Sequence, residues 1–295
     1  MRAEGNACRR GGEYTWLMTG GLRIGVLGAG YIGSALAQAA AADERNAVWA
    51  VRRSAAPANP ERVNWLRGDV ARGTIDGLPG QLDVVILTVA PSHASDGYDA
   101  TYPPCAAAAA ALARDCGARA LLYTSSTGVY GVRDGGWVTE ASPRLGAGST
   151  NAALIAAEDI VFACTGARAT VMRVAGIYGP GRDPRARMRG AEALPQRGEY
   201  WTNLAHRDDI VAAMLHVLRL EHAPHVLNVS DGSPTRAADV ARWLASASGL
   251  DPATLVFGND TQRSRNDQRV SNTVLVATGW VPDYPSFRDG FARGM

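Results

Sequence analysis

The sequence predicts an α/β fold, a Rossmann-type doubly wound parallel sheet with a small C-terminal lobe. Three observations support this prediction. Short apolar segments alternate with helical segments along most of the 295 residues, and a glycine-rich turn at 28–33 directly follows the first apolar segment. The composition, with 46% hydrophobic and 20% charged residues, is that of a globular protein with a sizeable core. Alternation of this kind gives a parallel sheet covered by helices on both faces, with ligands bound at the carboxyl ends of the strands.

The expected strands are short and apolar, and each ends at a turn or a helix. The run at 83–90 is apolar on both faces, which is typical of a buried parallel strand. The strands are expected at 22–27, 47–51, 63–66, 83–90, 120–124, 169–174 and 226–229.

The expected helices lie between these strands. The segment 106–114 is almost pure alanine, the residue with the highest helix propensity, so it predicts a helix and not a low-complexity tract. After Gly249 the chain becomes rich in loops. The helices are expected at 34–42, 106–114, 151–164, 208–220 and 237–245.

The same pattern divides the chain into a nucleotide-binding core, a smaller lobe and an N-terminal tail. The core is expected to comprise residues 21–178 and 205–230, and the substrate lobe 179–204 and 231–295. Residues 1–20 contain no continuous apolar stretch, so they do not resemble a secretory signal. Since periodic structure starts only at Leu22, shortly after Met18, they are either a disordered tail or an over-extended start.

The charge balance favours a small molecule as the partner. Thirty basic and 28 acidic side chains give a net charge of +2, which favours neither nucleic acid nor an anionic membrane. All the basic residues are arginines, and the sequence contains no lysine. Any chemistry that needs a lysine ammonium group or a Schiff base is therefore excluded.

The cysteines and the apolar runs indicate a cytoplasmic protein. The four cysteines are scattered without a CxxC pair, which favours reduced thiols and no metal site. The longest apolar runs, at 84–90 and 105–113, are far shorter than the ~18 residues of a membrane-spanning helix. We therefore expect a soluble protein without a membrane partner.

The turn at 28–33 is the clearest functional signal. Gly28, Gly30 and Gly33 after a first strand permit a tight turn, close approach of a pyrophosphate, and close packing of the next helix. At the end of the second strand, where an NAD site places a carboxylate, the chain has Arg52 and Arg53. Guanidinium groups suit a 2′-phosphate, so NADP is favoured and NAD is the alternative. The other interpretation is that both arginines face solvent.

Several segments together support a resemblance to a known family. They are Gly28-Ala29-Gly30-Tyr31-Ile32-Gly33, Gly68-Asp69, Ser125-Ser126-Thr127-Gly128-Val129-Tyr130-Gly131, Arg173 with 176–182, and 203–209. In order and spacing they resemble the extended short-chain dehydrogenase/reductases, the epimerase/dehydratase superfamily, over about residues 22–290. The chain is most similar to an atypical, YeeZ-like branch of this superfamily.

The resemblance implies a role for individual residues. Ser126 would hydrogen-bond a substrate carbonyl or alcohol, while Asp69 and Val70 would flank the adenine. Val89 and Ala90 would line the cofactor ribose. The residues implied to bind the cofactor are Gly28, Gly30, Tyr31, Ile32, Gly33, Arg52, Arg53, Asp69, Val70, Val89, Ala90 and Pro180, with Tyr178 also near the nicotinamide.

The chain departs from the family at the usual YxxxK pair. With Glu158 as the anchor, Thr150 stands at the tyrosine position and Leu154 at the lysine position. Neither can act as an acid or base, so another group must donate the proton in an active enzyme. The candidates are Tyr130, Tyr178 and His206; alternatively, the tyrosines are packed structural residues and the histidine orients a loop.

The substrate would be contacted from the segment after the glycine-proline loop. Arg182, Trp201 and Asn203 are the expected contacts. The arginines at 182, 185, 187, 189 and 197 would either clamp a phosphate or carboxylate, or form a solvated loop.

Two functions remain open. The first is an NAD(P)-dependent oxidoreductase or epimerase-like enzyme that acts on a small hydroxyl or carbonyl compound, sugars included, as a monomer or homodimer. The second is a catalytically idle NADP-binding sensor or scaffold.

Overall fold

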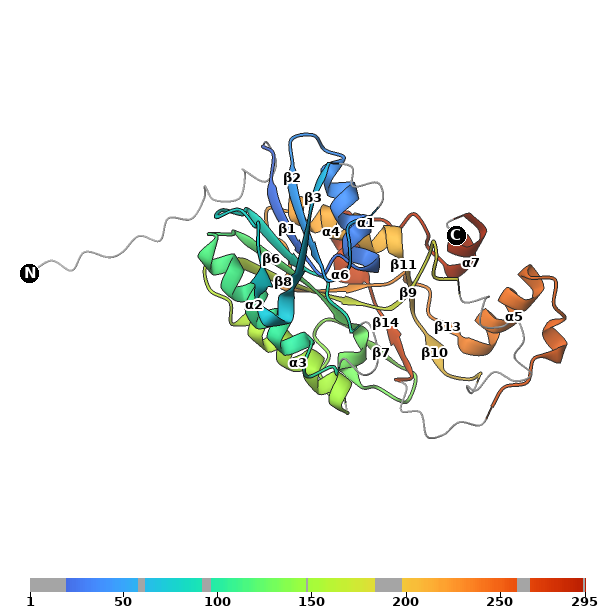
Figure 1. Ribbon diagram of the computed structural model, residues 1–295. Helices are drawn as coiled ribbons and strands as arrows, with labels where there is room; N and C mark the ends of the chain where they lie inside the picture. The colour runs from blue at the N-terminus through green and yellow to red at the C-terminus, as the bar shows by residue number, and fades with distance from the viewer. Residues whose placement is uncertain are drawn as a thin grey trace, which may run out of the picture.

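A computed structural model describes residues 20–57, 62–91, 97–146, 148–183, 198–258, 266–293 and 295. Its centre is an eight-stranded sheet with the order β12-β8-β6-β5-β1-β2-β3-β4 (Figure 1). Seven strands run parallel, and only β4 pairs antiparallel, with β3. The strands are β1 Arg23–Leu27, β2 Ala47–Arg52, β3 Val63–Asp69, β4 Thr74–Ile75, β5 Val84–Leu87, β6 Ala120–Ser126, β8 Arg168–Val174 and β12 Val226–Val229.

The strand β1 lies at the centre of this order. Ile24 is paired with Val48 of β2 on one side and with Val84 of β5 on the other. The chain therefore winds outward from β1 first in one direction, through β2 and β3, and then in the other, through β5 and β6. Such a switch point leaves a crevice at the carboxyl ends of the two central strands, where ligands of doubly wound sheets bind.

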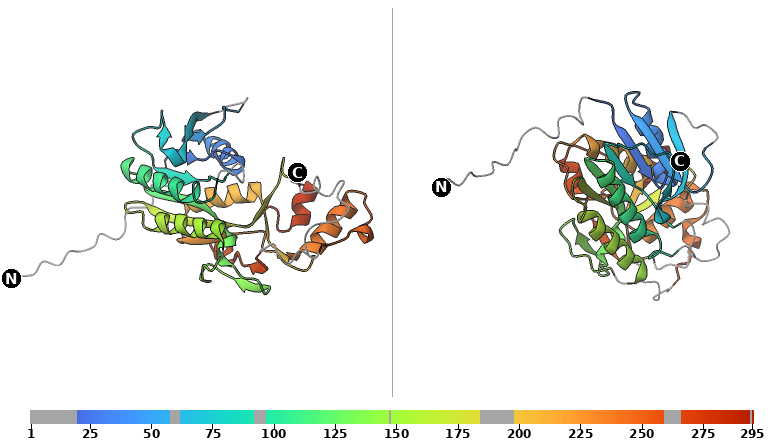
Figure 2. Two further views of the ribbon diagram at one scale, coloured as in Figure 1. Left: turned by 60° about the horizontal axis from the view of Figure 1, so that its bottom comes forward. Right: turned by 60° about the vertical axis from the view of Figure 1, so that its left-hand side comes forward.

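Helices cover both faces of the sheet (Figure 2). On one face α1 (Tyr31–Ala41), α4 (Arg207–Arg219) and α6 (Thr273–Ala277) pack in one apolar cluster with Ile24 and Val26. On the other face α2 (Tyr102–Asp115) and α3 (Ser149–Phe162) pack with Leu27 of the same strand. The alternation of side chains along β1 thus supplies both clusters. The predicted doubly wound fold is confirmed.

The alanine-rich α2 shows why this composition gives a packed helix. Ala106, Ala109 and Ala113 recur at helical spacing and are fully buried. Pro103 and Pro104 lie in the first turn, where the missing N–H groups cost no helical hydrogen bond. The helix consequently starts four residues earlier than its alanine run predicts.

Smaller elements join the sheet to the C-terminal part of the chain. The short pairs are β7 (Gly136–Val138) with β14 (Gln268–Val270), β9 (Gly176–Tyr178) with β11 (Leu204–His206), and β10 (Trp201–Thr202) with β13 (Thr235–Arg236). Beyond one end of the sheet lie α5 (Ala237–Ala247), η6 (Pro252–Thr254) and α7 (Phe287–Arg293) (Figures 1 and 2). Two further 3-10 turns, η2 (Val70–Arg72) and η4 (Thr127–Tyr130), follow β3 and β6.

All seven predicted strands and all five predicted helices occur, with ends shifted by a few residues. The strand ends differ most at β3, which runs three residues beyond its predicted end to Asp69, and at β5, which ends at Leu87, three residues before its predicted end. The predicted division into core and lobe stays a prediction, and the predicted tail lies outside the described residues except for Gly20. In the part of the chain that the structure describes, no helix is long and apolar enough to cross a membrane.

Candidate functional site

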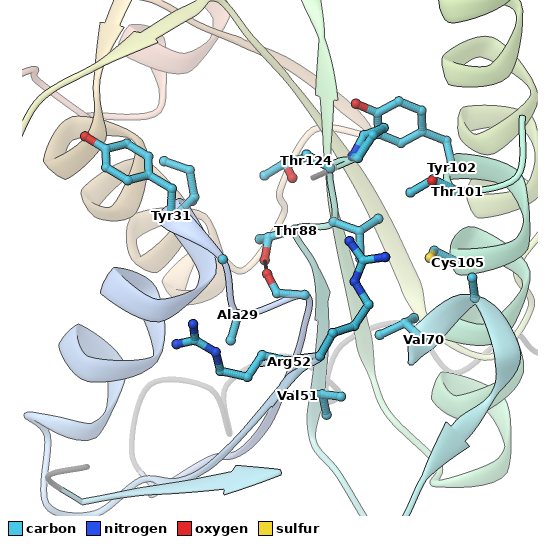
Figure 3. A pocket seen from close by; sticks show the side chains of 18 of the residues that line it. Ala29, Tyr31, Val51, Arg52, Val70, Thr88, Thr101, Tyr102, Cys105 and Thr124 are labelled. Atoms are coloured by element: carbon cyan, nitrogen blue, oxygen red, sulfur yellow. Dashed lines mark hydrogen bonds between the residues drawn. The ribbon is translucent and has the colours of Figure 1, made fainter. Parts of the chain in front are cut away.

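A pocket of about 870 Å³ opens at the switch point of the sheet (Figure 3). Its walls come from the carboxyl ends of β1, β2, β3, β5, β6 and β8, from Ile177 of β9, and from the starts of α1 and α2. This volume lies within the range of small-molecule and cofactor sites. The predicted cofactor residues in its lining are Gly28, Gly30, Tyr31, Ile32, Arg52, Arg53, Asp69, Val70, Val89 and Ala90.

Each of the three glycines in the turn leaves space for a different neighbour. Gly28 has a φ of +91°, and a Cβ there would lie 2.6 Å from Val89 Cγ1. A Cβ on Gly33 would lie 2.4 Å from Thr88 Oγ1 and 2.6 Å from Gly28 O, so this glycine permits close packing of α1 against the sheet. Around Gly30, in contrast, the nearest atom to a Cβ is 3.9 Å away. Gly30 therefore keeps open space at the pocket wall, which fits a group of the size of a diphosphate.

The start of α1 adds a favourable electrostatic environment for that group. Gly30 is the N-cap, no side chain caps the helix, and its first turn contains no acidic residue. The first N–H groups of the helix and the positive end of its dipole thus remain available to an anion at the pocket wall. The shape and the charge of this turn both fit a dinucleotide.

The end of the pocket next to β2 is cationic. Arg52 donates from Nε to Ser54 Oγ over 2.9 Å, and its guanidinium lies 5.9 Å from the centre of the Trp65 ring. Arg53 also lines this end. Nearby, Asp69 accepts a hydrogen bond of 3.0 Å from Ala71 N at the start of η2, which fixes the loop that brings Val70 into the lining.

Ser126 stands at the carboxyl end of β6, half-buried in the pocket wall. Its Oγ accepts a hydrogen bond of 3.1 Å from Gly128 N and so forms the N-cap of η4. Because the oxygen accepts in this bond, the hydroxyl proton remains free to donate toward a ligand. Ser126 thus presents a hydroxyl donor at this end of the pocket.

A buried ion pair fixes the wall behind Ser126. Glu158 of α3 is fully buried and accepts bonds from Arg173 Nε at 3.0 Å and Arg173 Nη2 at 2.8 Å. The same carboxylate accepts a bond of 2.6 Å from Ser125 Oγ. Leu154, one turn earlier on α3, is buried in an apolar cluster with Val129. The described helix α3 carries neither a tyrosine nor a lysine.

The three predicted proton donors lie outside the lining of the pocket. Tyr130 is fully buried and donates to Asn228 Oδ1 over 2.6 Å, and burial raises its pKa. Tyr178 packs against Phe291 with ring centres 4.8 Å apart, and burial raises its pKa as well. His206 is fully buried, and its Nδ1 accepts from Asp208 N at 3.2 Å. The structure brings none of these three into the described pocket lining, and their role as proton donors stays a prediction.

Of the predicted substrate contacts, only Arg182 lines the pocket. Its guanidinium lies 4.9 Å from the centre of the Tyr31 ring, and Tyr31 OH donates to Pro180 O over 3.0 Å. Asn203 instead holds the link between β10 and β11 against β14, because its side chain bonds Gln268 O and Val270 N of that strand. Trp201 is stacked between two guanidinium groups, those of Arg236 at 4.2 Å and Arg269 at 5.2 Å. The arginines at 185, 187, 189 and 197 lie outside the described residues.

The sequence analysis missed several polar groups in the lining. Thr88 and Thr124 lie at the carboxyl ends of apolar runs, which is a signal that could have identified them. Thr101, Tyr102 and Cys105 come from the first turn of α2. No local pattern marks these three, because their position depends on how that turn packs against the sheet.

Comparisons with known proteins agree with this geometry. The model of the NAD dependent epimerase/dehydratase family matches residues 24–230. The protein YeeZ of Escherichia coli K12 is 28% identical over 166 residues, which cover 56% of this chain and 58% of YeeZ. The match thus spans less than two thirds of the length of this curated relative.

Two solved structures are similar over most of the chain. A Methylobacillus flagellatus protein assigned as an NAD-dependent epimerase/dehydratase is 28% identical, with a TM-score of 0.75 over 92% of this chain and 96% of that one. The dTDP-glucose 4,6-dehydratase DesIV of Streptomyces venezuelae, with NAD and TYD bound, is 21% identical with a TM-score of 0.77. The match covers 92% of this chain and 95% of the DesIV chain. At 21% identity this likeness supports the fold alone.

Proposed function

The chain belongs to the NAD-dependent epimerase/dehydratase family, and from this we propose that it binds a nicotinamide dinucleotide in the pocket at the switch point. We propose further that it acts as an oxidoreductase or epimerase-like enzyme on a small hydroxyl or carbonyl compound, with sugars among the candidates. The observation that carries the proposal is the glycine turn. Its open space at Gly30 and its uncapped helix start form a site for a diphosphate.

In the proposed arrangement the dinucleotide extends along the carboxyl ends of the strands. The diphosphate lies on the turn, Asp69 and Val70 flank the adenine, and Val89 and Ala90 contact a ribose. DesIV, which shares the fold over 95% of its length, is a protein with NAD bound. Ser126 faces the other end of the dinucleotide.

NADP is the proposed form of the cofactor. Arg52 and Arg53 lie at the end of β2, next to the place expected for the adenosine ribose. Their guanidinium groups can donate charge-assisted hydrogen bonds to a 2′-phosphate, whereas an NAD site places a carboxylate there.

The chemistry of the proposed enzyme is a hydride exchange between the nicotinamide and the substrate carbon. Ser126 donates its free hydroxyl proton in a hydrogen bond to the substrate oxygen. This bond polarises a carbonyl and strengthens as negative charge develops on the oxygen. Arg182, next to Tyr31 at the pocket mouth, is a candidate contact for an anionic substrate group.

A catalytically idle NADP-binding sensor is the second candidate function. One observation favours it: α3 presents Thr150 and Leu154 where relatives are expected to have the tyrosine and the lysine. Turnover of any alcohol or carbonyl compound at ~1 s⁻¹ or faster, the low end of ordinary kcat values, would exclude this candidate.

The experiment that tests the proposed function compares the wild type with Gly30→Ala. An alanine Cβ meets no atom closer than 3.9 Å, so the variant should keep its fold while the methyl group occupies the space of the diphosphate. We expect NADPH to bind the wild type, measured by its fluorescence, and to bind the variant at least ~10-fold more weakly. Equal binding by the two proteins would contradict the proposed site, as would a wild type that binds neither NADPH nor NADH.

A further inference from the structure

We propose that Tyr102 replaces the missing catalytic tyrosine and donates the proton to the substrate oxygen held by Ser126. This inference rests on the proposed function, since it names the proton donor of the same reaction. Tyr102 is the first residue of α2, far in sequence from the segment where the family's tyrosine is expected.

The tyrosine hydroxyls of the pocket support this assignment. Two tyrosines line the pocket, Tyr31 and Tyr102. The Tyr31 hydroxyl is already engaged, because it donates to Pro180 O. The Tyr102 hydroxyl has no hydrogen-bond partner among the described residues, and it is not one of the buried polar atoms. It is therefore a free donor that a ligand in the pocket can reach.

The packing of Tyr102 places it beside the expected position of the lysine. The Tyr102 ring is partly buried against the apolar cluster that contains Leu154 and Val129. Val129 belongs to η4, the turn that Ser126 caps. The ring thus packs on the apolar cluster that joins α3 to the serine turn.

The positions of Arg52 and Tyr102 at opposite ends of the pocket support the same assignment. Figure 3 shows Arg52 at one end and Tyr102 with Thr124 at the other, with the Tyr102 ring extending from the start of α2 toward the strand that carries Thr124. Arg52 is the proposed contact of the adenosine phosphate. A dinucleotide that begins at Arg52 therefore has its nicotinamide near Thr124, Ser126 and Tyr102.

The step is balanced without any additional catalyst. The substrate carbonyl carbon takes a hydride from the reduced cofactor, which is oxidised, and the carbonyl π bond breaks. The carbonyl oxygen takes the proton of the Tyr102 hydroxyl and becomes an alcohol. The Tyr102 oxygen is left as a phenolate, which water from the open pocket reprotonates.

The environment of Tyr102 keeps its hydroxyl protonated at neutral pH, so the residue is in the form that donates a proton. Burial, and then Tyr98, raise its pKa to about 12. The other titratable groups around it are Cys105 one turn further on, Tyr123 on β6 and Tyr130 on η4, and burial raises the pKa of each. No neighbouring cation offsets these effects among the described contacts of Tyr102. Carbonyl reduction should therefore be nearly independent of pH from ~6 to ~9, while alcohol oxidation should rise with pH.

The test compares Tyr102→Phe with the matched control Tyr98→Phe. The Tyr98 ring stacks on Tyr102 with centres 5.9 Å apart, but Tyr98 is outside the pocket lining. The probes are 4-nitrobenzaldehyde and 9,10-phenanthrenequinone, reduced with saturating NADPH. We expect Tyr102→Phe to lower the rate by ~10²- to 10⁴-fold, with the NADPH dissociation constant unchanged, and Tyr98→Phe to stay close to the wild type.

A second measurement does not involve the cofactor. The infrared C=O stretch of carbonyl-labelled 4-nitrobenzaldehyde, bound to the cofactor-free protein, should lie at lower wavenumber in the wild type than in Tyr102→Phe, because a hydroxyl donor weakens the carbonyl bond. The pH profile of the wild type should rise for oxidation and remain flat for reduction.

The outcomes distinguish a failure of the proposed Tyr102 role from a failure of the proposed function. If Tyr102→Phe retains the full rate, or loses only NADPH affinity, the proton-donor role is overturned and the proposed function stands. If the wild type binds no NADPH, or binds it and reduces neither probe, the proposed function fails and this inference fails with it.

Discussion

At the scale of single residues, the polar groups of the site differ in whether other protein groups already form hydrogen bonds with them. The Tyr130 hydroxyl and the Asn203 amide are engaged by other protein groups, so they contribute to the fold. The Ser126 proton and the Tyr102 hydroxyl have no acceptor or partner among the described residues, and both lie in the pocket wall. Availability of the polar atom, and not the residue type, therefore separates the candidate catalytic groups from the structural ones.

Arg52 gives a prediction about cofactor choice. Arg52→Ala should weaken NADPH binding by ~10- to 100-fold, because a hydrogen bond to a charged group contributes about 1.5–3 kcal/mol. NADH, which has no 2′-phosphate, should bind the variant and the wild type equally. Fluorescence titration measures both affinities. Arg62→Ala, which removes an exposed arginine paired with Glu44 outside the pocket, is the control and should change neither.

Asp231 gives a prediction about pH. Burial, with a contribution from the nearby Asp209, raises the pKa of the Asp231 carboxyl to about 7, whereas an unfolded aspartate titrates near ~3.9. The folded state thus holds the proton more tightly. The stabilising contribution is complete below pH ~4, falls as the pH rises toward about 7 and is absent above it.

The free energy of unfolding of the wild type should therefore decrease between pH ~4 and ~7. In Asp231→Asn this decrease should be absent. The shift sets an upper bound of about 4 kcal/mol for this decrease. Urea unfolding across this pH range measures it, with Asp239→Asn on the exposed face of α5 as the control. A pH dependence that persists in Asp231→Asn would show that other groups cause it.

At the scale of elements, the pair of Glu158 and Arg173 fixes α3 to β8. Both side chains are almost entirely buried, and burial opposes the charge on Arg173 while the bidentate bonds to Glu158 raise its pKa above the usual value. A buried pair of this kind need not stabilise more than apolar residues would. Removal of one partner, however, leaves the other charge uncompensated.

Glu158→Gln should consequently cost ~3–5 kcal/mol of the free energy of unfolding. The change keeps the size of the side chain but removes the charge that compensates Arg173. Its neighbour on the same helix supplies the control: Asp159 forms a partly exposed ion pair with Arg144, and Asp159→Asn should cost less than ~1 kcal/mol. Urea unfolding of the two variants under the same conditions gives both numbers, and equal losses would contradict the argument.

The sequence predicts those elements that are determined by residues close to one another in the chain. The strands and helices of the sheet, and the turn at Gly28, Gly30 and Gly33, follow from periodicity and from glycine sterics within a few residues. The pair of β7 and β14 does not, because strands of three residues carry no pattern and their partners are about 130 residues apart. Tyr102 was missed for a similar reason, since its place in the pocket depends on the packing of α2 against β6 and α3.

At the scale of the whole molecule, the pocket is made by the carboxyl ends of six strands of the central sheet and by two helices, which meet at one edge of the sheet. A ligand that binds there contacts only the folded state, so it should stabilise the protein as a whole. NADPH at 100 times its dissociation constant should add ~2.7 kcal/mol to the free energy of unfolding. Thermal unfolding should show a higher Tm with NADPH than without it, and Gly30→Ala should show a smaller increase at the same NADPH concentration.

The turn that Ser126 caps is supported by a segment that follows every strand of the central sheet in the sequence. Asn266 Nδ2 donates to Gly128 O at 2.9 Å, and Gln268 Nε2 donates to Thr127 O at 2.8 Å. Translation from the N-terminus therefore yields every strand of the central sheet well before these two amides leave the ribosome. A nascent chain can therefore collapse around its core while this turn still lacks its support, so competence to act would be acquired only after residues 266–268 have been made.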